Sequence, residues 1–129
     1  MMKINEEITL ENVIGKVATL MVSDYRFVTM TAVDCDEYFD IYYHFDRNYE
    51  LYNLKLELAK DANLPSITKV CPCAFVIENE IQDLFGITMT DLELDFEKHF
   101  ILNEDAPEKP FCRVPGVSVS TVEVKGEQK

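Results

Sequence analysis

The sequence predicts an α+β fold, a two-layer sandwich in which one helix precedes, and one follows, an antiparallel three-stranded meander. Between residues 25 and 58, apolar and polar side chains alternate with a period of two, and β-branched and aromatic residues are frequent. On either side of this region, apolar residues recur at the spacing of amphipathic helices. A sheet with an apolar face needs cover, so we expect both helices to pack on the same face.

Composition narrows the possible classes of protein. The 129 residues suffice for one domain with a real core, and a hydrophobic content of 47% argues against disorder. The net charge of −12 opposes binding to nucleic acid or anionic lipid, because both require neutralising cations. No apolar run approaches the roughly 20 residues that cross a bilayer. The N-terminal residues resemble no signal peptide, so we expect a cytoplasmic protein that reaches a membrane only through partners.

The first half of the chain should provide the first helix and the meander. Residues 1–8 are expected to form an extended lead-in, and Thr9 suits the N-cap of the first helix. The apolar positions of that helix are Leu10, Val13, Ile14, Val17, Leu20 and Met21. Strands are expected over residues 25–33, 38–45 and 50–58, with turn chemistry at residues 46–48.

Alternation assigns the side chains of these strands to faces. The first strand should place Phe27, Thr29, Thr31 and Val33 on one face. The second strand should likewise place Phe39, Ile41, Tyr43 and Phe45 on one face. The third should direct Tyr52, Leu54, Leu56 and Leu58 inward, and Asn53, Lys55 and Glu57 outward.

A second helix is expected between Cys71 and Gly86. Pro72 suits its first turn, where a missing N–H has no consequence, and Gly86 suits the position just past its end. The apolar stripe comprises Ala74, Ile77, Ile81 and Leu84. The opposite side carries Glu78, Asn79, Gln82 and Asp83, with Glu80 close by.

The chain after this helix should be less regular. Residues 87–89 are expected to form a brief strand, and three prolines after residue 103 exclude regular structure. We therefore expect a single α+β domain at residues 1–102 and an extended, proline-containing tail at residues 103–129. The tail should lie on a partner, because it retains apolar side chains at Phe111, Val114, Val117, Val119 and Val122.

The sequence contains no obvious catalytic constellation. Cys71 and Cys73 are too close for a C-x-x-C zinc or redox pattern, although a metal or cluster site with Cys112, or a redox pair, remains an alternative. A carboxylate-bound metal at the acidic residues of the second helix is disfavoured, since positions 78 and 80 diverge on a helix.

Docking suits the acidic residues better than catalysis does. If the apolar stripe faces the sheet, the carboxylates of Glu78, Glu80 and Asp83 point outward, where they can bond to a partner's Arg or Lys. Phe85 can then act as an aromatic anchor. Equally, Phe85 can belong to the core and the carboxylates can cap local N–H groups.

Residues 78–87 read E-N-E-I-Q-D-L-F-G-I. This run resembles the E-x-E-x-x-D-L-F-G-I signature of the C subunit of respiratory complex I (the 30-kDa family) and its counterparts in energy-converting hydrogenases. Looser similarity covers residues 25–90. The resemblance implies a cofactor-free scaffold subunit at the cytoplasmic face of the membrane. The implied docking residues are Glu78, Glu80, Asp83, Leu84, Phe85 and Gly86.

The same resemblance implies the partners and their cofactors. These partners are a hydrogenase-like or 49-kDa-type large subunit and an iron–sulfur small subunit, which hold the iron–sulfur clusters and, in hydrogenases, the NiFe centre. After Ile87 the chain reads T-M-T-D-L-E-L instead of the G-H-P-containing stretch of complex I, and Asn79 replaces an arginine. Both departures resemble the short subunits of energy-converting (Ech-type) or formate-hydrogenlyase-type hydrogenases, and we favour the Ech-type branch. The contrasting hypothesis is a stand-alone α+β regulatory module that binds a small ligand.

Overall fold

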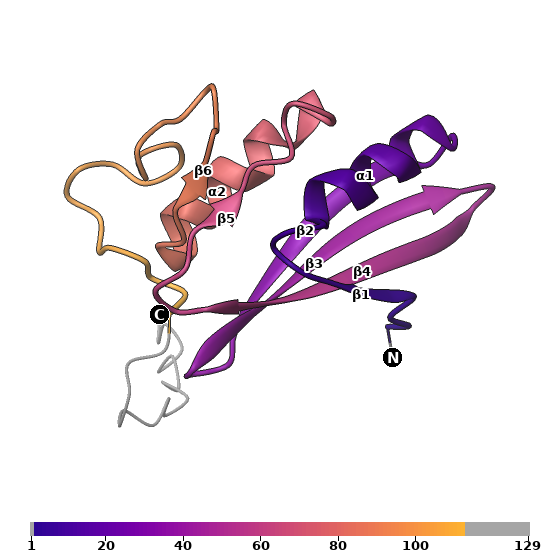
Figure 1. Cartoon of the computed structure of the whole chain (residues 1–129). Helices are drawn as coiled ribbons and strands as arrows, with labels where there is room; N and C mark the ends of the chain where they lie inside the picture. The colour runs from indigo at the N-terminus through magenta and orange to yellow at the C-terminus, as the bar shows by residue number, and fades with distance from the viewer. Residues whose placement is uncertain (1, 113–129) are drawn as a thin grey trace, which may run out of the picture.

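The computed structural model describes residues 2–112 and confirms the predicted two-layer α+β architecture. Four strands form a mixed sheet in the order β1-β4-β3-β2, and both helices lie on one of its faces (Figure 1). The elements in chain order are β1 (Glu6–Ile8), α1 (Val13–Val22), β2 (Arg26–Asp34), β3 (Tyr38–Arg47), β4 (Glu50–Ala59), β5 (Leu64–Pro65), the 3₁₀ helix η1 (Pro72–Ala74), α2 (Phe75–Phe85) and β6 (Met89–Thr90).

The extended lead-in is a strand, which the sequence did not predict. Strand β1 pairs in parallel with β4, so the sheet is mixed and not a simple meander. Asn5 and Asn53 hold the pairing, because the Asn53 N–H donates to Asn5 Oδ1 at 2.8 Å and the Asn5 N–H donates to the Asn53 carbonyl at 2.9 Å. Asn53 is therefore buried, although alternation placed it on the outward face.

Helix α1 begins at Val13, later than the sequence suggested. Thr9 is not its N-cap: Asn12 takes that position, and Asn12 Oδ1 accepts the backbone N–H of Thr9 at 2.8 Å. Val13 and Val17 are fully buried, whereas Ile14 is on the exposed side of the helix. The buried stripe is thus narrower than predicted.

The predicted faces hold for β3 and for most of β4. Phe39, Ile41, Tyr43 and Phe45 are all buried against the helices. The turn predicted at residues 46–48 lies slightly later, at residues 48–49. The chain reverses at Asn48 and Tyr49, whose φ angles are 52° and 67°, so that Arg47 pairs with Glu50. Two successive positive φ values are typical of a type I′ hairpin, which matches the twist of the strands.

A β-bulge changes the face assignment of β2. Phe27 pairs with Phe45, but Thr29 pairs with the preceding residue His44, so Val28 is an extra residue. Beyond the bulge, Met30 and Ala32 face inward, so Thr29, Thr31 and Val33 do not share a face with Phe27 as predicted, since Phe27 packs against the core. A bulge shifts the alternation by one residue, and the composition of β2 gives no sign of it.

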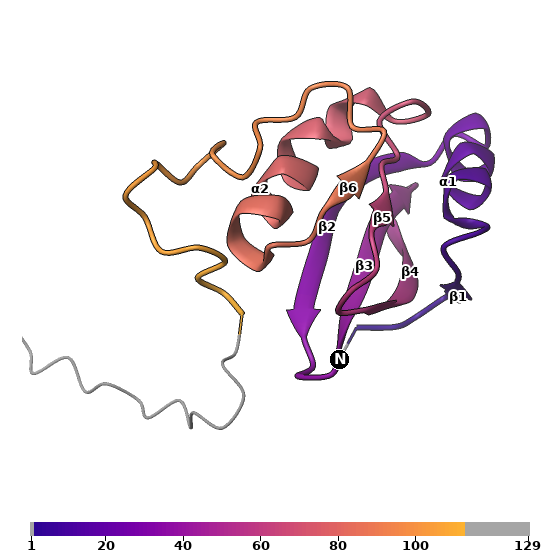
Figure 2. The same ribbon diagram turned by 60° about the vertical axis from the view of Figure 1, so that its left-hand side comes forward.

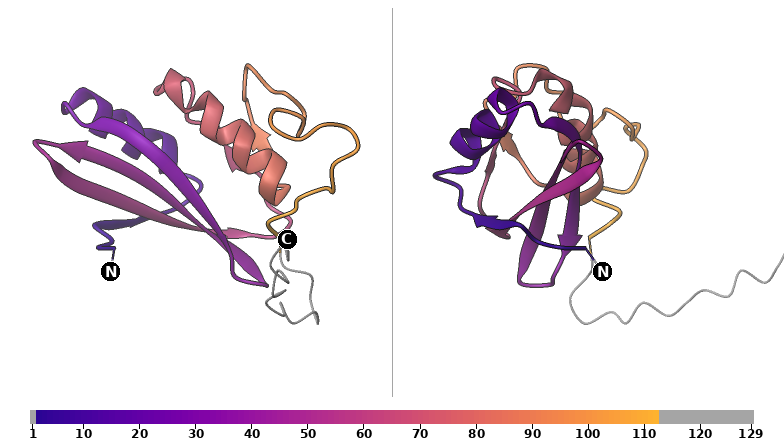
Figure 3. Two further views of the ribbon diagram at one scale, coloured as in Figure 1. Left: turned by 180° about the vertical axis from the view of Figure 1, so that it is seen from behind. Right: turned by 90° about the vertical axis from the view of Figure 1, so that its right-hand side faces the viewer.

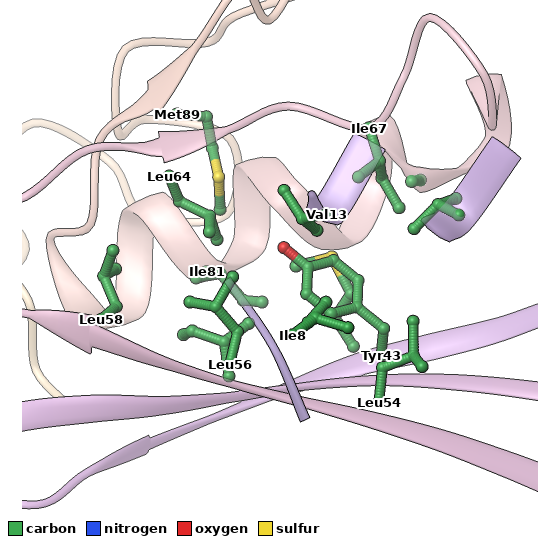
Figure 4. Packing of buried hydrophobic residues seen from close by; sticks show 14 of the residues in the cluster. Ile8, Val13, Tyr43, Leu54, Leu56, Leu58, Leu64, Ile67, Ile81 and Met89 are labelled. Carbon is green, nitrogen blue, oxygen red and sulfur yellow. The ribbon is translucent and has the colours of Figure 1, made fainter. Parts of the chain in front are cut away.

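The core fills the space between the sheet and α2, where side chains from β3, β4 and the helix meet (Figure 4).

The ends of the second helical region are marked by the two residues that the sequence indicated. Pro72 opens η1, and Gly86 lies just past the end of α2, in the left-handed conformation. Strand β6 pairs with β5, so a second, two-stranded sheet lies beside α2 (Figure 2). Neither helix within residues 2–112 has the length and apolar character needed to span a bilayer.

Candidate docking site at the second helix

The polar face of α2 is buried inside the protein. The relative exposures are 0% for Glu78, 0% for Asn79, 2% for Gln82 and 1% for Asp83. The expectation that the carboxylates point outward is therefore wrong for Glu78 and Asp83, because other segments of the chain cover them. Glu80 remains half-buried.

Glu78 fastens α2 to the loop that follows β5. Its Oε1 accepts the backbone N–H of Ile67 at 2.7 Å, and its Oε2 accepts the hydroxyl of Ser66 at 2.6 Å. Burial raises the pKa of Glu78, and these two hydrogen bonds offset part of that rise. The neighbouring Tyr43 hydroxyl is buried without a partner among the described residues, and burial raises its pKa as well.

The two amide side chains of this face hold the chain that follows α2. Asn79 Nδ2 donates to the carbonyl of Leu94 at 2.8 Å, and Asn79 Oδ1 accepts the N–H of Phe96 at 3.0 Å. Gln82 Oε1 accepts the N–H of Met89 at 2.9 Å, and Gln82 Nε2 donates to Asp95 Oδ1 at 2.9 Å. Asn79 thus satisfies two backbone groups of a segment that has little regular structure of its own, and Gln82 bonds to both β6 and that segment.

Asp83 completes this set of contacts. Its Oδ2 accepts the backbone N–H groups of Ile101 and Leu102, at 2.5 and 3.0 Å. Its Oδ1 is buried with no hydrogen-bond partner among residues 2–112. The carboxylate also lines a surface pocket of about 260 Å³ next to Gly86 and Lys98.

Residues 91–102, which we term the strap, therefore owe their position to α2. The strap passes along the side of α2 that is turned away from α1 (Figures 1 and 3). Leu92 of the strap packs into the core, whereas three of its apolar side chains are exposed: Leu94 is 50% exposed, Phe96 40% and Ile101 54%. We term these three side chains the apolar ridge.

The last residues of the signature organise the C-terminal end of α2. The Phe85 ring packs edge-on against Phe39 and Phe111, with centroid distances of 6.3 and 5.7 Å. The carbonyl of Leu84 accepts the N–H of Phe111 at 2.8 Å. Phe85 is thus half-buried and packs against the core. The predicted tail begins by folding back on α2, and its valines beyond residue 112 lie outside the described residues.

The cysteines and carboxylates do not assemble the metal sites considered from the sequence. Cys71 and Cys73 lie at the start of η1, with their Sγ atoms 3.5 Å apart. Cys112 lies at the other end of α2, where its thiol donates to the Phe85 carbonyl at 2.9 Å. Within residues 2–112, no three His, Cys, Asp or Glu side chains are grouped to hold a metal ion.

Sequence reasoning missed the roles of Asn79 and Gln82. A signal was present: the polar face of α2 consists of Glu, Asn, Gln and Asp and contains no lysine or arginine. Long cationic side chains are common on solvated faces, since their charged ends reach water easily. A face composed only of shorter hydrogen-bonding groups is better suited to capping backbone groups of an adjoining segment.

Comparison with known proteins identifies relatives of this fold and signature. A family model described as "Respiratory-chain NADH dehydrogenase, 30 Kd subunit" matches residues 8–113. The NADH-quinone oxidoreductase C subunit from Ruegeria pomeroyi is 41% identical over 76 residues, which cover 53% of this chain and 38% of the relative. Its counterpart from Roseobacter denitrificans is 29% identical over 94 residues, which cover 66% and 47%. The chain thus spans less than half the length of these curated relatives.

A solved structure shares the fold at low sequence identity. A chain in the membrane-bound sulfane sulfur reductase, an archaeal respiratory membrane complex, superposes with a TM-score of 0.65 and 19% identity. The match covers 81% of this chain and 65% of that chain. This similarity supports the observed arrangement of helices and sheet.

Proposed function

The chain belongs to the respiratory-chain NADH dehydrogenase 30-kDa subunit family, and from this premise we propose that it is a non-catalytic scaffold subunit of a complex-I-related, membrane-bound oxidoreductase. In this proposal it lies in the hydrophilic arm at the cytoplasmic face and docks a large subunit of the 49-kDa or hydrogenase-like type against an iron–sulfur small subunit. The iron–sulfur clusters, and a NiFe centre in the hydrogenase branch, belong to those partners.

The observation that carries this proposal is the way in which α2 holds the strap. Asn79, Gln82 and Asp83 bond to the strap and Glu78 bonds to the loop after β5, while the apolar ridge faces outward. Fully burying a Leu, Ile or Phe side chain contributes about 1.5–3 kcal/mol, so covering three half-exposed ones gives a partner several kcal/mol. A segment held in one conformation before binding also loses little conformational entropy on binding.

The signature residues then act in two ways. Glu78, Asp83 and Gly86 shape the surface from within, and Leu84 and Phe85 anchor the chain after the strap. Half-buried Glu80 keeps a carboxylate near the surface, where it suits a basic side chain of a partner. The net charge of −12 also favours a basic partner surface.

We further propose the energy-converting hydrogenase branch rather than complex I proper. What supports this choice is the chain after Ile87, which lacks the G-H-P-containing stretch of complex I, together with Asn79 at a position where complex I has an arginine. In the structure Asn79 is fully buried and bonds to the strap. An arginine there would need a differently placed strap, because its guanidinium cannot accept the Phe96 N–H.

Gentle affinity purification of the tagged, full-length chain from its native membranes tests this function. We expect mass spectrometry to identify a large hydrogenase-like or 49-kDa-type subunit, an iron–sulfur small subunit and multi-spanning membrane subunits. A homo-oligomer without these companions would overturn the scaffold function and favour a stand-alone ligand-binding module.

A further inference from the structure

Two thiols lie side by side at the start of η1, outside the contacts that hold the strap. Cys71 and Cys73 flank Pro72, and their Sγ atoms are 3.5 Å apart. Cys71 is fully buried, whereas Cys73 is exposed. The pair therefore combines one thiol that solvent reaches with one that only its neighbour reaches.

The exposed thiol opens onto a surface pocket that admits a small molecule. This pocket of about 340 Å³ lies between α2 and the bulged part of β2, and Cys73 lines it together with Val28, Val76 and Glu80. Val28 and Val76 are themselves 45% and 43% exposed. A small disulfide can thus reach Cys73 without any rearrangement of the core.

We propose that Cys71 and Cys73 form a redox-active thiol pair, which closes to an intramolecular disulfide by exchange with a small-molecule disulfide of the glutathione type. In the first step the Cys73 thiolate attacks one sulfur of the oxidised glutathione, and one glutathione thiolate leaves. In the second step the Cys71 thiolate attacks Cys73 Sγ and displaces the second glutathione thiolate. The protein loses two protons and two electrons, and one glutathione disulfide becomes two glutathione thiols.

The order of attack follows from burial and proximity. Burial raises the pKa of the Cys71 thiol to about 12, so at pH 8 only about one part in 10⁴ is thiolate and external disulfides do not reach it. Well-oriented intramolecular reactants have effective molarities of about 10⁵ M or more, which offsets that small fraction. Cys73 therefore reacts first and Cys71 completes the exchange.

Peptide mapping of the full chain after treatment with oxidised glutathione tests this proposal, independently of the scaffold function. The sample is reduced, exposed to oxidised glutathione, quenched with acid and alkylated. We expect the peptide containing both thiols to lose two hydrogens, to resist alkylation and to retain little glutathione. Half-buried Cys112, whose thiol donates to the Phe85 carbonyl, serves as the internal control for a cysteine outside the pair.

Two variants separate the roles of the two sulfurs. We expect Cys71→Ser to retain at least ten times more glutathione on Cys73 than the parent chain, because the displacing thiol is absent. In Cys73→Ser, Cys71 should remain free of glutathione. The proposal is overturned if the parent chain retains glutathione on Cys73 as fully as Cys71→Ser does, or if both thiols of the parent remain fully alkylatable.

Discussion

Oε1 of Glu78 accepts the backbone N–H of Ile67 at 2.7 Å, which joins the middle of α2 to the loop that leads into η1. This contact explains how the Glu78 carboxylate can be accommodated in α2 although none of its surface reaches solvent. The same logic extends along the helix to Asn79, Gln82 and Asp83, each of which satisfies backbone groups of a neighbouring segment. The polar signature residues thus hydrogen-bond to neighbouring segments from inside the protein, and in this way they determine the shape of the outer surface.

Substitutions at Glu78 should separate two contributions to the free energy of unfolding, that of its size and hydrogen bonds and that of its charge. Glu78→Ala leaves the Ile67 N–H and the Ser66 hydroxyl without their buried acceptor, so we expect the free energy of unfolding to fall by about 1–3 kcal/mol or more. Glu78→Gln retains an acceptor for the Ile67 N–H, so its free energy of unfolding should fall by less than that of Glu78→Ala. Urea titrations of both variants measure the difference, and equal losses would contradict a role based on hydrogen bonding.

The pH dependence of stability should report the buried charge of Glu78. Because burial raises its pKa in the folded state above the ordinary 4.5, its contribution to stability is fully present below that value and is lost as pH rises through the folded-state pKa. Relative to Glu78→Gln, the parent chain should therefore become less stable as pH rises above about 4.5. Unfolding curves at several pH values for both chains check this, and a pH-independent difference would be inconsistent with it.

Asp83 should control the order of the strap. Asp83→Ala removes the acceptor of the Ile101 and Leu102 N–H groups, and a hydrogen bond to a charged group contributes about 1.5–3 kcal/mol. We expect these two amides to exchange at least about tenfold faster with deuterium, since local opening then needs less free energy. The control is Glu80→Ala, which removes a half-buried carboxylate from the same helix. Equal acceleration in both variants would exclude a specific role for Asp83.

The two glycines in the helical regions should respond oppositely to alanine. Gly86 has a φ of +71°, and a Cβ there would lie 3.0 Å from the Lys109 side chain, so Gly86→Ala should destabilise by about 1 kcal/mol or more. Gly15 lies inside α1, where an added methyl group would meet only open space, so Gly15→Ala should stabilise by up to about 1 kcal/mol. Thermal unfolding of the two variants measures both shifts. Shifts of the same sign would contradict this account of Gly86.

Local patterns predicted the elements whose signals lie within a few residues. The alternation of Phe39, Ile41 and Tyr43 identified the buried face of β3, and Gly86 marked the end of α2. These features depend on periodicity and on the conformational freedom of one residue, both of which can be read directly from a sequence.

Features that depend on distant parts of the chain could not be predicted in the same way. Strand β1 exists because Asn5 meets Asn53, and the face switch in β2 follows from a single extra residue at Val28. The signature residues lie on α2 and at its C-terminal end, as the pattern indicated, but the outward orientation expected for Glu78 and Asp83 was wrong. Their burial depends on the path of the strap, which carries little periodic signal of its own.

Surface variants on the strap provide the sharpest test of whether the apolar ridge contacts partner subunits. Leu94→Glu/Ile101→Glu changes the ridge, whereas Val22→Glu/Leu51→Glu introduces the same charge at two side chains that are 82% and 62% exposed elsewhere. Each tagged double variant is purified gently from native membranes, and mass spectrometry quantifies the partner subunits recovered per tagged chain. We expect the recovery of partner subunits to fall at least about tenfold, equivalent to about 1.4 kcal/mol, for the ridge variant alone. Equal recovery of partners by the two variants would contradict it.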